Sequence, residues 1–504
     1  MADFKFIDLF AGIGGFKMAF SKYGGECVGF SEIAKDAIKY YCDNYNLSEE
    51  LNLGSITNID ELPEHDILTA GVPCQSWSIA GKNLGFDDDR GQLWNDTIYL
   101  LQKSKPKAFI FENVKGLVDP RNKDALKYIL SRIKEAGYHA DYYVLNSFNY
   151  GVPQNRIRIY IVGFKNKRDF DNFRIPNSVK NPIKLSEILG VQLRERNKIK
   201  KSQKDLFGNV INAPQMSLSK NDGFNDYFLF NDLRNGDTTI HSWDILDTSE
   251  REKEICLMLL KNRRKKKFGK LDGNPLSLKH FKELDQTIIK RDLTELVNKE
   301  ILKEEEYSFE ILDFEEQDLT EHELFLLNTV EANIITKDKL KLNKEFRKRK
   351  ISFTDTLESL KEKKYIKCNE KRYDFKNTKI SSGLFGINRI FLPTANLFST
   401  LVASDTNDFV TDIEIDKISK EQYKSDFLVK IYNKEKYRKI TKEEACLIQG
   451  FPKDFKLPEA RNRWMKLIGN SVSVPVIEIL VNAIVETGVF VSEKKHEPTT
   501  IDMT

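Results

Sequence analysis

Short apolar runs recur along the first third of the chain, and each ends in glycine, proline or polar residues. Such runs predict buried strands, and we expect them at 5–10, 27–30, 53–57, 66–69, 106–111, 142–145 and 156–163. Helical patterns lie between them, at 16–21, 95–103 and 123–136. Strands that alternate with helices predict a doubly wound α/β sheet, whose ligand crevice lies at the carboxyl ends of its parallel strands.

Length and composition set broad limits. The chain has 504 residues, 40% of them hydrophobic and 31% charged, which is enough for two or three globular domains. No apolar run approaches the roughly 20 residues of a membrane span, and residues 1–5 do not begin a signal peptide. We therefore expect a cytoplasmic protein. The six cysteines are scattered without the close spacing of zinc ligands, so we expect no metal.

A glycine turn follows the first predicted strand, in Ala11-Gly12-Ile13-Gly14-Gly15. Glu32 ends the second strand about 20 residues later, where an acidic side chain in nucleotide-binding folds meets ribose hydroxyls. The pair indicates a cofactor that contains a nucleoside. A tight turn and an unrelated surface glutamate would explain the same two features.

Three further strand ends carry reactive side chains. Cys74 follows the strand at 66–69 on a Gly/Pro turn, a setting that suits a nucleophilic thiolate better than apolar packing does. Glu112 ends the strand at 106–111 and is expected to face the same crevice. Arg156 and Arg158 alternate with apolar residues, so they are expected on one face of a strand.

Taken in this order and spacing, the fragments resemble the DNA (cytosine-5)-methyltransferases, such as those of bacterial restriction–modification systems. The resemblance covers residues 6–164 and 393 to about 485. It rests on motifs at 8–15, 32, 71–76, 89–93, 112–114, 154–158, 438–441, 449–452 and 469–472.

The resemblance implies a fold and a chemistry. The fold is a Rossmann-like S-adenosylmethionine-dependent methyltransferase domain with a smaller target-recognition domain. Cys74 is then the nucleophile that attacks carbon 6 of a flipped-out cytosine in double-stranded DNA. Glu112 is the acid at N3, and Arg158, helped by Arg156, holds O2. The methyl group goes to carbon 5.

The resemblance also implies contacts with the cofactor and DNA. S-adenosyl-L-methionine is expected against Phe10, Gly12, Gly14, Glu32, Ile33, Ser55, Ile56, Pro73, Leu93, Asn470 and Val472. One departure concerns 54–57, where the family usually has an Asp for the adenine amino group and this chain has Ser55, a weaker partner. DNA is expected against Ser78, Lys82, Arg90 and Thr400. We also expect the protein to be a monomer. We expect it to protect host DNA from a cognate restriction endonuclease.

The expected domains follow the motifs. Residues 1–165 form the catalytic domain, which residues 466–490 complete. Residues 166–437 form the target-recognition region, residues 438–465 a hinge and return segment, and residues 491–504 a disordered tail.

The target-recognition region contains a mainly helical insertion at about 249–375. A helix with leucines three apart precedes an extended, charged segment twice, at Leu293 and Leu296 and again at Leu357 and Leu360. We interpret this as two winged-helix-like units, each with a short pair of strands, at 301–312 and at 364–375. Either they read or bend DNA, with basic segments on phosphates, or their charged faces are simply solvated.

Two other functions stay open. RNA is the alternative substrate, because related proteins modify tRNA, although the long basic middle favours DNA. A DNA-binding regulator without catalysis is the alternative outside enzymes. The presence of Cys74, Glu112 and Arg158 together speaks against a regulator, since a binding module needs none of them.

Overall fold

The chain folds into two units, which the computed structural model describes for residues 4–73, 89–178, 183–194, 226–330, 333–378 and 382–491. The first unit comprises Met1–Lys220 and Phe391–Thr504, and the second comprises Asn221–Ile390. The first unit is therefore discontinuous in sequence, and the second is inserted into it.

The apolar runs of the first third form a six-stranded sheet in the order β2-β1-β3-β4-β6-β5. Its strands are β1 (Phe4–Leu9), β2 (Gly25–Ser31), β3 (Ile67–Gly71), β4 (Ala108–Val114), β5 (His139–Asn146) and β6 (Ile157–Phe164). β1 to β4 pair in parallel, whereas β6 runs antiparallel to both β4 and β5. The predicted doubly wound α/β sheet is confirmed, with one reversed strand near its edge.

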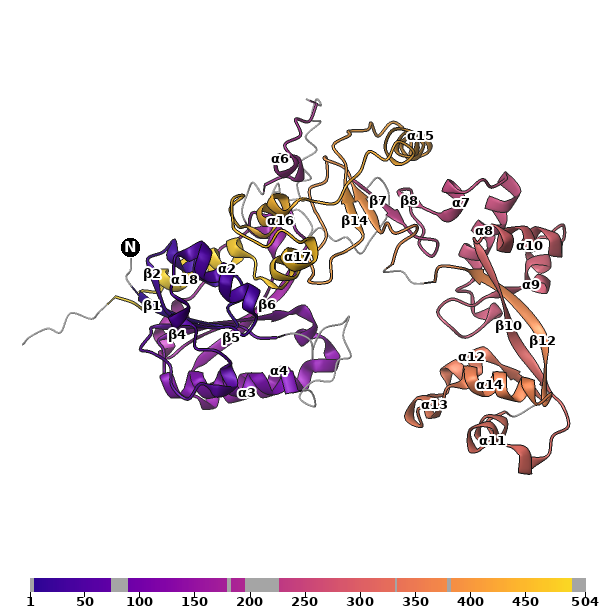
Figure 1. The fold of residues 1–504 in the computed structure, drawn as a ribbon, viewed down its shortest axis with the longest axis horizontal. Helices are drawn as coiled ribbons and strands as arrows, with labels where there is room; N and C mark the ends of the chain where they lie inside the picture. Colours follow the sequence, from indigo (N-terminus) through magenta and orange to yellow (C-terminus); the bar gives the residue numbers. More distant parts are fainter. Residues whose placement is uncertain are drawn as a thin grey trace, which may run out of the picture. The chain divides into compact units, whose positions relative to one another are not determined.

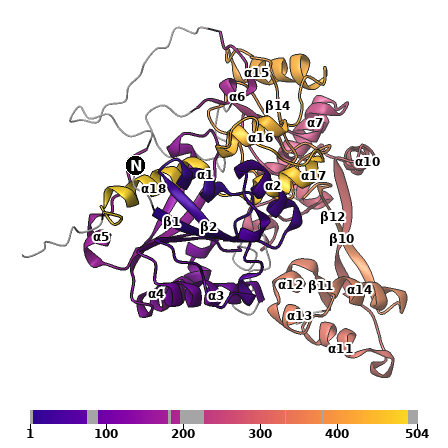
Figure 2. The ribbon, with the colours of Figure 1, turned by 60° about the vertical axis from the view of Figure 1, so that its left-hand side comes forward.

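Helices cover both faces of this sheet (Figures 1 and 2). α3 (Asp89–Ser104) and α4 (Lys123–Glu135) lie along one face, where their leucines and isoleucines share a core with Phe109 and Phe111 of β4. The other face carries α1 (Gly15–Ser21), α2 (Lys35–Tyr45) and α18 (Val474–Glu486). α18 comes from the far end of the chain, so the carboxyl-terminal segment completes the sheet domain.

The segment at 53–57, expected to be a strand, is not one. Asn52 forms a single bridge with Phe30, and Ile56–Asn58 form a 3-10 turn. Gly54 has a φ of 75°, which interrupts an extended conformation.

The rest of the first unit is made of short elements. They are α5 (Lys167–Asn172), α6 (Leu185–Leu189), β14 (Asp408–Val410), α15 (Lys420–Phe427), a π-helical turn (Leu428–Tyr432), α16 (Lys442–Gln449) and α17 (Arg461–Asn470). Arg461–Glu486 is long and apolar enough to cross a membrane by composition. It consists of two helices, α17 and α18, separated at Ser471–Ser473, and 67% of its most apolar window is buried in the protein. It is therefore a core element.

The second unit opens with β7 (Tyr227–Phe230) and β8 (Thr239–Ile240), which pair in parallel, and with α7 (Ser242–Ile245). Two successions of helix, strand, helices and long strand follow. The first is α8 (Glu250–Asn262), β9 (Leu276–Ser277), α9 (Leu278–Leu284), α10 (Lys290–Asn298) and β10 (Leu302–Ile311). The second is α11 (Glu321–Asn328), β11 (Ile334–Thr336), α12 (Lys337–Leu342), α13 (Lys344–Lys348), α14 (Phe353–Glu362) and β12 (Ile366–Phe375). β13 (Arg389–Phe391) leads back to the first unit.

The strands of this insertion differ from the expectation. Each segment expected to be a short pair of strands is one long strand, and β10 pairs with β12 from Leu302↔Phe375 to Ile311↔Ile366. β9 adds to the β12 end of this ribbon and β11 to β10, which gives the order β11-β10-β12-β9. Each half therefore takes its third strand from the other half.

Candidate active site

The reactive edge of the sheet is where β3 and β4 end. Gly71, the last residue of β3, lies in register with Glu112 of β4. Asn113 donates from Nδ2 to the Val72 carbonyl at 3.2 Å and so fixes the chain just after β3. Cys74 follows two residues later, outside the described residues, as do Ser78, Lys82 and the side chain of Arg90.

Glu112 and Arg158 form an ion pair at this edge, with 3.1 Å between Arg158 Nε and Glu112 Oε1. The pair exists because β6 is antiparallel to β4, which puts Arg158 opposite Val114 and on the same face as Glu112. Both side chains are largely buried, with exposed fractions of 15% for Arg158 and 12% for Glu112. Burial raises the pKa of Glu112, and this effect outweighs the positive charges of Arg158 and Arg156, which lower it. A carboxyl group with a raised pKa is suited to hold and donate a proton.

Arg156 differs from the expectation that it alternates with Arg158 along a strand. β6 begins only at Ile157, and the Arg156 guanidinium donates to the main-chain carbonyls of Leu401, Gly469 and Ser471. These carbonyls lie hundreds of positions further along the chain, so local sequence carried no signal for them. Arg156 ties the start of β6 to the carboxyl-terminal part of the first unit.

The turn after β1 leaves room for a ligand beside its backbone. Gly12 has a φ of 56°, and a Cβ placed there would meet no atom of the described residues within 4 Å. Phe10 also has a positive φ, of 54°, and Gly14 has one of 83°. Gly15 instead approaches the side chain of Val472 so closely that a Cβ would lie 2.6 Å from its Cγ2. The glycines thus provide an open cradle at Gly12 and a tight contact with the carboxyl-terminal segment at Gly15.

Glu32 lies at the other wall of this turn. Its carboxylate accepts from the backbone N–H of Gly12 at 2.9 Å, and from those of Ile33 and Ala34 at 2.8 Å each. Asn52, which sequence reasoning missed, accepts from the Glu32 N–H and donates to its carbonyl. The only available signal was the Asn-x-Gly turn at 52–54.

Ile33 is 74% exposed although it is a large apolar residue. Ser55 shares a hydrogen bond of 2.8 Å with Thr57, and Ile56 is buried. Because Ser31 Oγ donates to the Gly54 carbonyl, the turn at 54–57 lies beside the end of β2, next to Ile33. An exposed isoleucine near hydroxyl groups is a surface on which a purine ring can pack.

The remaining predicted cofactor residues differ in exposure. Pro73 and Leu93 are half-buried, Asn470 is exposed at the end of α17, and Val472 is buried. Val472 reaches the glycine turn through its contact with Gly15. The structure thus brings the first and last parts of the chain together at the β1 end of the crevice.

Thr400 is the remaining predicted DNA contact. It lies on a segment that runs alongside residues 153–155. Its hydroxyl donates to the Asn155 carbonyl, and Asn155 donates its N–H to the Phe398 carbonyl at 2.9 Å. Thr400 is thus held beside Asn155, which lies two residues before the start of β6, the strand that carries Arg158.

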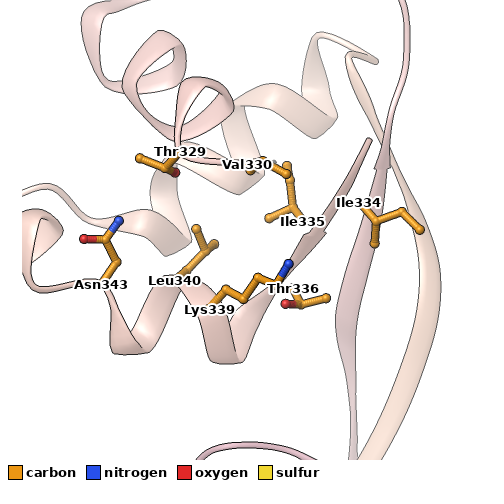
Figure 3. A pocket seen from close by; sticks show the side chains of 8 residues that line it. All are labelled: Thr329, Val330, Ile334, Ile335, Thr336, Lys339, Leu340 and Asn343. Atoms are coloured by element: carbon orange, nitrogen blue, oxygen red, sulfur yellow. The ribbon is translucent and has the colours of Figure 1, made fainter. Parts of the chain in front are cut away.

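A small pocket lies in the second unit between the end of α11, β11 and α12 (Figure 3). Its volume of about 30 Å³ leaves room for only a few water molecules. It is lined by Thr329, Val330, Ile334, Ile335, Thr336, Lys339, Leu340 and Asn343. A nucleoside does not fit there.

Comparison with known proteins places the chain in a family. The family model for C-5 cytosine-specific DNA methylases matches residues 4–339 and 329–486. The type II methyltransferase M.HgiBI of Herpetosiphon aurantiacus is 40% identical over 487 residues, which cover 96% of this chain and 97% of the relative. M.HgiCII of the same organism is 39% identical, with 98% and 99% covered. The type II methyltransferase M.BanI of Aneurinibacillus aneurinilyticus is 34% identical over 380 residues, with 66% and 84% covered.

The likeness to the first two relatives includes the second unit as well as the sheet domain. Together with the Glu112–Arg158 pair and the glycine turn, it confirms the predicted family, the fold and the enzyme class. The chain belongs to the C-5 cytosine-specific DNA methylases and is a DNA cytosine methyltransferase of the type II restriction–modification kind.

Proposed function

We propose that the protein methylates carbon 5 of one cytosine within a specific double-stranded DNA sequence, through transient covalent attack by Cys74 on a flipped-out base. The observation that carries the proposal is the buried Glu112–Arg158 pair beside the strand end that leads to Cys74.

The proposed steps follow from the side chains. The Cys74 thiolate adds to carbon 6, and the electron pair displaced through the ring reaches N3, where Glu112 delivers its proton. Arg158 neutralises charge at O2 and then at the Glu112 carboxylate that remains. Bound S-adenosylmethionine supplies the methyl group. The methylated ring returns its N3 proton to the Glu112 carboxylate, and loss of the carbon 5 proton to a base then expels the thiolate and restores the aromatic ring.

The cofactor is proposed to lie against the cradle at Gly12, with Glu32 accepting from the ribose hydroxyls and adenine on Ile33. Two features support this: the open space beside Gly12 and the 74% exposure of Ile33. Phe10, Gly14, Ser55, Ile56, Pro73, Leu93, Asn470 and Val472 complete the proposed pocket. No metal is required by these steps.

The proposed DNA contacts are Ser78, Lys82 and Arg90, which follow Cys74, and Thr400. We further propose a monomeric, cytoplasmic bacterial enzyme that protects host DNA from a cognate endonuclease. The proposed domains are 1–165 with 466–490 for catalysis, 166–437 for recognition, and 438–465 as the hinge, with 491–504 as a tail.

Bisulfite sequencing of DNA from cells that express the protein tests the reaction and identifies the site. We expect one cytosine in one short sequence context to resist conversion, and no protection with Cys74→Ala. Protection that persists in Cys74→Ala cells would refute the nucleophile, and tRNA methylation with unmodified DNA would favour the RNA alternative.

A further inference from the structure

The second unit has two halves of the same design. Leu293 and Leu296 of α10 pack in the core of the first half, as Leu357 and Leu360 of α14 do in the second. The halves share the β10–β12 ribbon, because β9 of the first half pairs with β12 and β11 of the second half pairs with β10. The two cores therefore lie at opposite ends of one continuous sheet, the first around Leu302 and Phe375 and the second around Phe309 and Ile366.

The first half carries a basic loop between α8 and β9. Residues 264–270 contain six positions other than glycine, five of them Lys or Arg and none acidic. Lys265, Lys266, Lys267 and Lys270 are exposed. Arg264 forms an ion pair with Asp272, but within the described ranges no carboxylate pairs with Lys265, Lys266 or Lys270. Their charges are free to meet an external anion.

The loop is held rigidly at its base. Arg263 is buried and donates to both carboxylate oxygens of Asp374 on β12, at 2.9 Å each. Asn274 closes the loop by donating its N–H to the Arg263 carbonyl at 2.7 Å, and Phe268 is buried in the core. Because the backbone is anchored at both ends and in the middle, the lysines lose less conformational freedom on binding than those of a mobile loop.

In the second half, two lysines of the α14 end are paired with glutamates of the same unit. Lys361 pairs with Glu306 and Lys363 with Glu323, at 2.7 and 2.8 Å. The exposed face of α14 carries Asp355, Glu358 and Glu362, which repel phosphate. Lys339, Lys341 and Lys344 on α12 and α13 are exposed too. Their helices share one core with α14, so a phosphate bound by these lysines would also meet the negative charge of α14.

We propose that the first half of the second unit binds duplex DNA through the phosphates, with the basic loop 264–270 as its contact surface. The inference rests on the proposed function, since it assigns a second contact surface for the same DNA substrate. An array of free lysines on a fixed backbone recognises regularly spaced phosphates and carries no base specificity.

The test compares the full-length protein with two triple variants of equal charge change. One is Lys265→Glu, Lys266→Glu and Lys267→Glu in the loop, and the control is Lys339→Glu, Lys341→Glu and Lys344→Glu in the second half. Binding to a fluorescent 40-base-pair DNA duplex of mixed sequence is measured by anisotropy over a salt series.

We expect the loop variant to weaken binding at least about tenfold at 100 mM salt and to lower the log–log salt slope by about 2 to 3, at about 0.9 per lost phosphate contact. The control should change the affinity less than about threefold. Equal losses in both variants, or no loss in the loop variant, would overturn the proposal. A milder loop variant, with the same three lysines changed to Gln, should have a DNA affinity between those of wild type and the Lys→Glu variant. It replaces the Lys→Glu variant if charge reversal impairs folding.

Methyl transfer to saturating DNA separates this inference from the proposed function. Wild type and loop variant should both transfer methyl groups at similar maximal rates. If wild type methylates DNA but the loop variant binds as tightly as wild type, only the loop assignment fails. If wild type does not methylate DNA, the proposed function fails whatever the loop does.

Discussion

Gln154 and Gln449 are 295 positions apart in the sequence, and Gln154 Nε2 donates to Gln449 Oε1 at 2.8 Å in the buried interior of the first unit. Gln154 also donates to the Ile448 carbonyl and accepts from the Leu401 N–H, and Gln449 donates to the carbonyls of Ser471 and Val472. With Arg156, this amide pair joins four segments. The start of β6, the Thr400 segment, α16 and the end of α17 are thus held together at one point.

Removing the pair should weaken that joint. Gln154→Ala leaves the Gln449 carbonyl oxygen, the Ile448 carbonyl and the Leu401 N–H without this partner in a buried site, at a cost of about 1–3 kcal/mol per unsatisfied group. We expect a clear loss in the free energy of unfolding, measured by urea denaturation. Gln102→Ala, on the exposed face of α3, is the matched control and should change stability by less than about 0.5 kcal/mol. Equal losses of stability in Gln154→Ala and Gln102→Ala would contradict the claim that Gln154 holds these segments together.

Glu112→Gln should abolish most of the methyl transfer. The amide keeps the shape of the side chain but cannot deliver a proton to N3, so we expect the rate to fall by at least about 100-fold. Because burial raises the pKa of Glu112, the wild-type rate should fall as rising pH ionises the carboxyl group. The residual rate of the Glu112→Gln variant should not show this fall with rising pH. Glu26→Gln, exposed on β2, is the control and should leave both the rate and its pH profile unchanged.

Ile33→Ala should weaken cofactor binding without affecting the fold. An isoleucine that is 74% exposed contributes little to the core, but a purine packed on it would bury apolar surface worth about 1–2 kcal/mol. We expect a roughly tenfold rise in the Kd for S-adenosylmethionine, measured by calorimetry. Ile418→Ala, at 77% exposure, is the matched control. An unchanged Kd in Ile33→Ala would remove this residue from the proposed pocket.

Asp8 predicts a dependence of stability on pH. It is buried in β1, accepts from the Thr69 hydroxyl at 3.1 Å, and burial raises its pKa to about 8 from an ordinary value of 3.8. Between these two values the folded state holds a proton that the unfolded state has lost, so stability falls as pH rises, by up to about 1.4 kcal/mol per pH unit. Above pH 8 this contribution is constant.

Asp8→Asn removes the titrating group. Urea denaturation at pH 5 to 9 should show a flatter stability profile for the variant than for wild type, with the difference confined to the range below about pH 8. Parallel profiles would show that the Asp8 carboxyl group does not hold a proton in the folded protein.

Much of the first unit could be predicted because its central strands, such as β3 and β4, are buried on both faces and therefore appear in the sequence as apolar runs. The runs at 5–10, 27–30, 66–69 and 106–111 lie where β1 to β4 form. The turn at 53–57 misled this reasoning, since Leu53 and Ile56 are apolar but the φ of Gly54 breaks the strand. Glu112 was recognised from its position at a strand end, and that position depends only on local sequence.

Features that depend on distant partners could not be predicted. The contacts of Arg156 lie on three carbonyls beyond residue 400, and main-chain carbonyls leave no trace in a sequence. The exchange of β10 and β12 was missed for the same reason. Either a hairpin within each half or a ribbon between halves satisfies the alternating pattern, and only the tertiary fold selects the ribbon.

The most direct test is covalent trapping on a duplex with 5-fluorocytosine at the cytosine that bisulfite sequencing identifies. Fluorine at carbon 5 cannot leave as a proton does, so the bond between Cys74 and carbon 6 should persist. With S-adenosylmethionine present, we expect a complex that survives denaturing electrophoresis and is absent with Cys74→Ala. Efficient methylation of the unsubstituted duplex without any trapped complex on the fluorinated one would contradict covalent catalysis by Cys74.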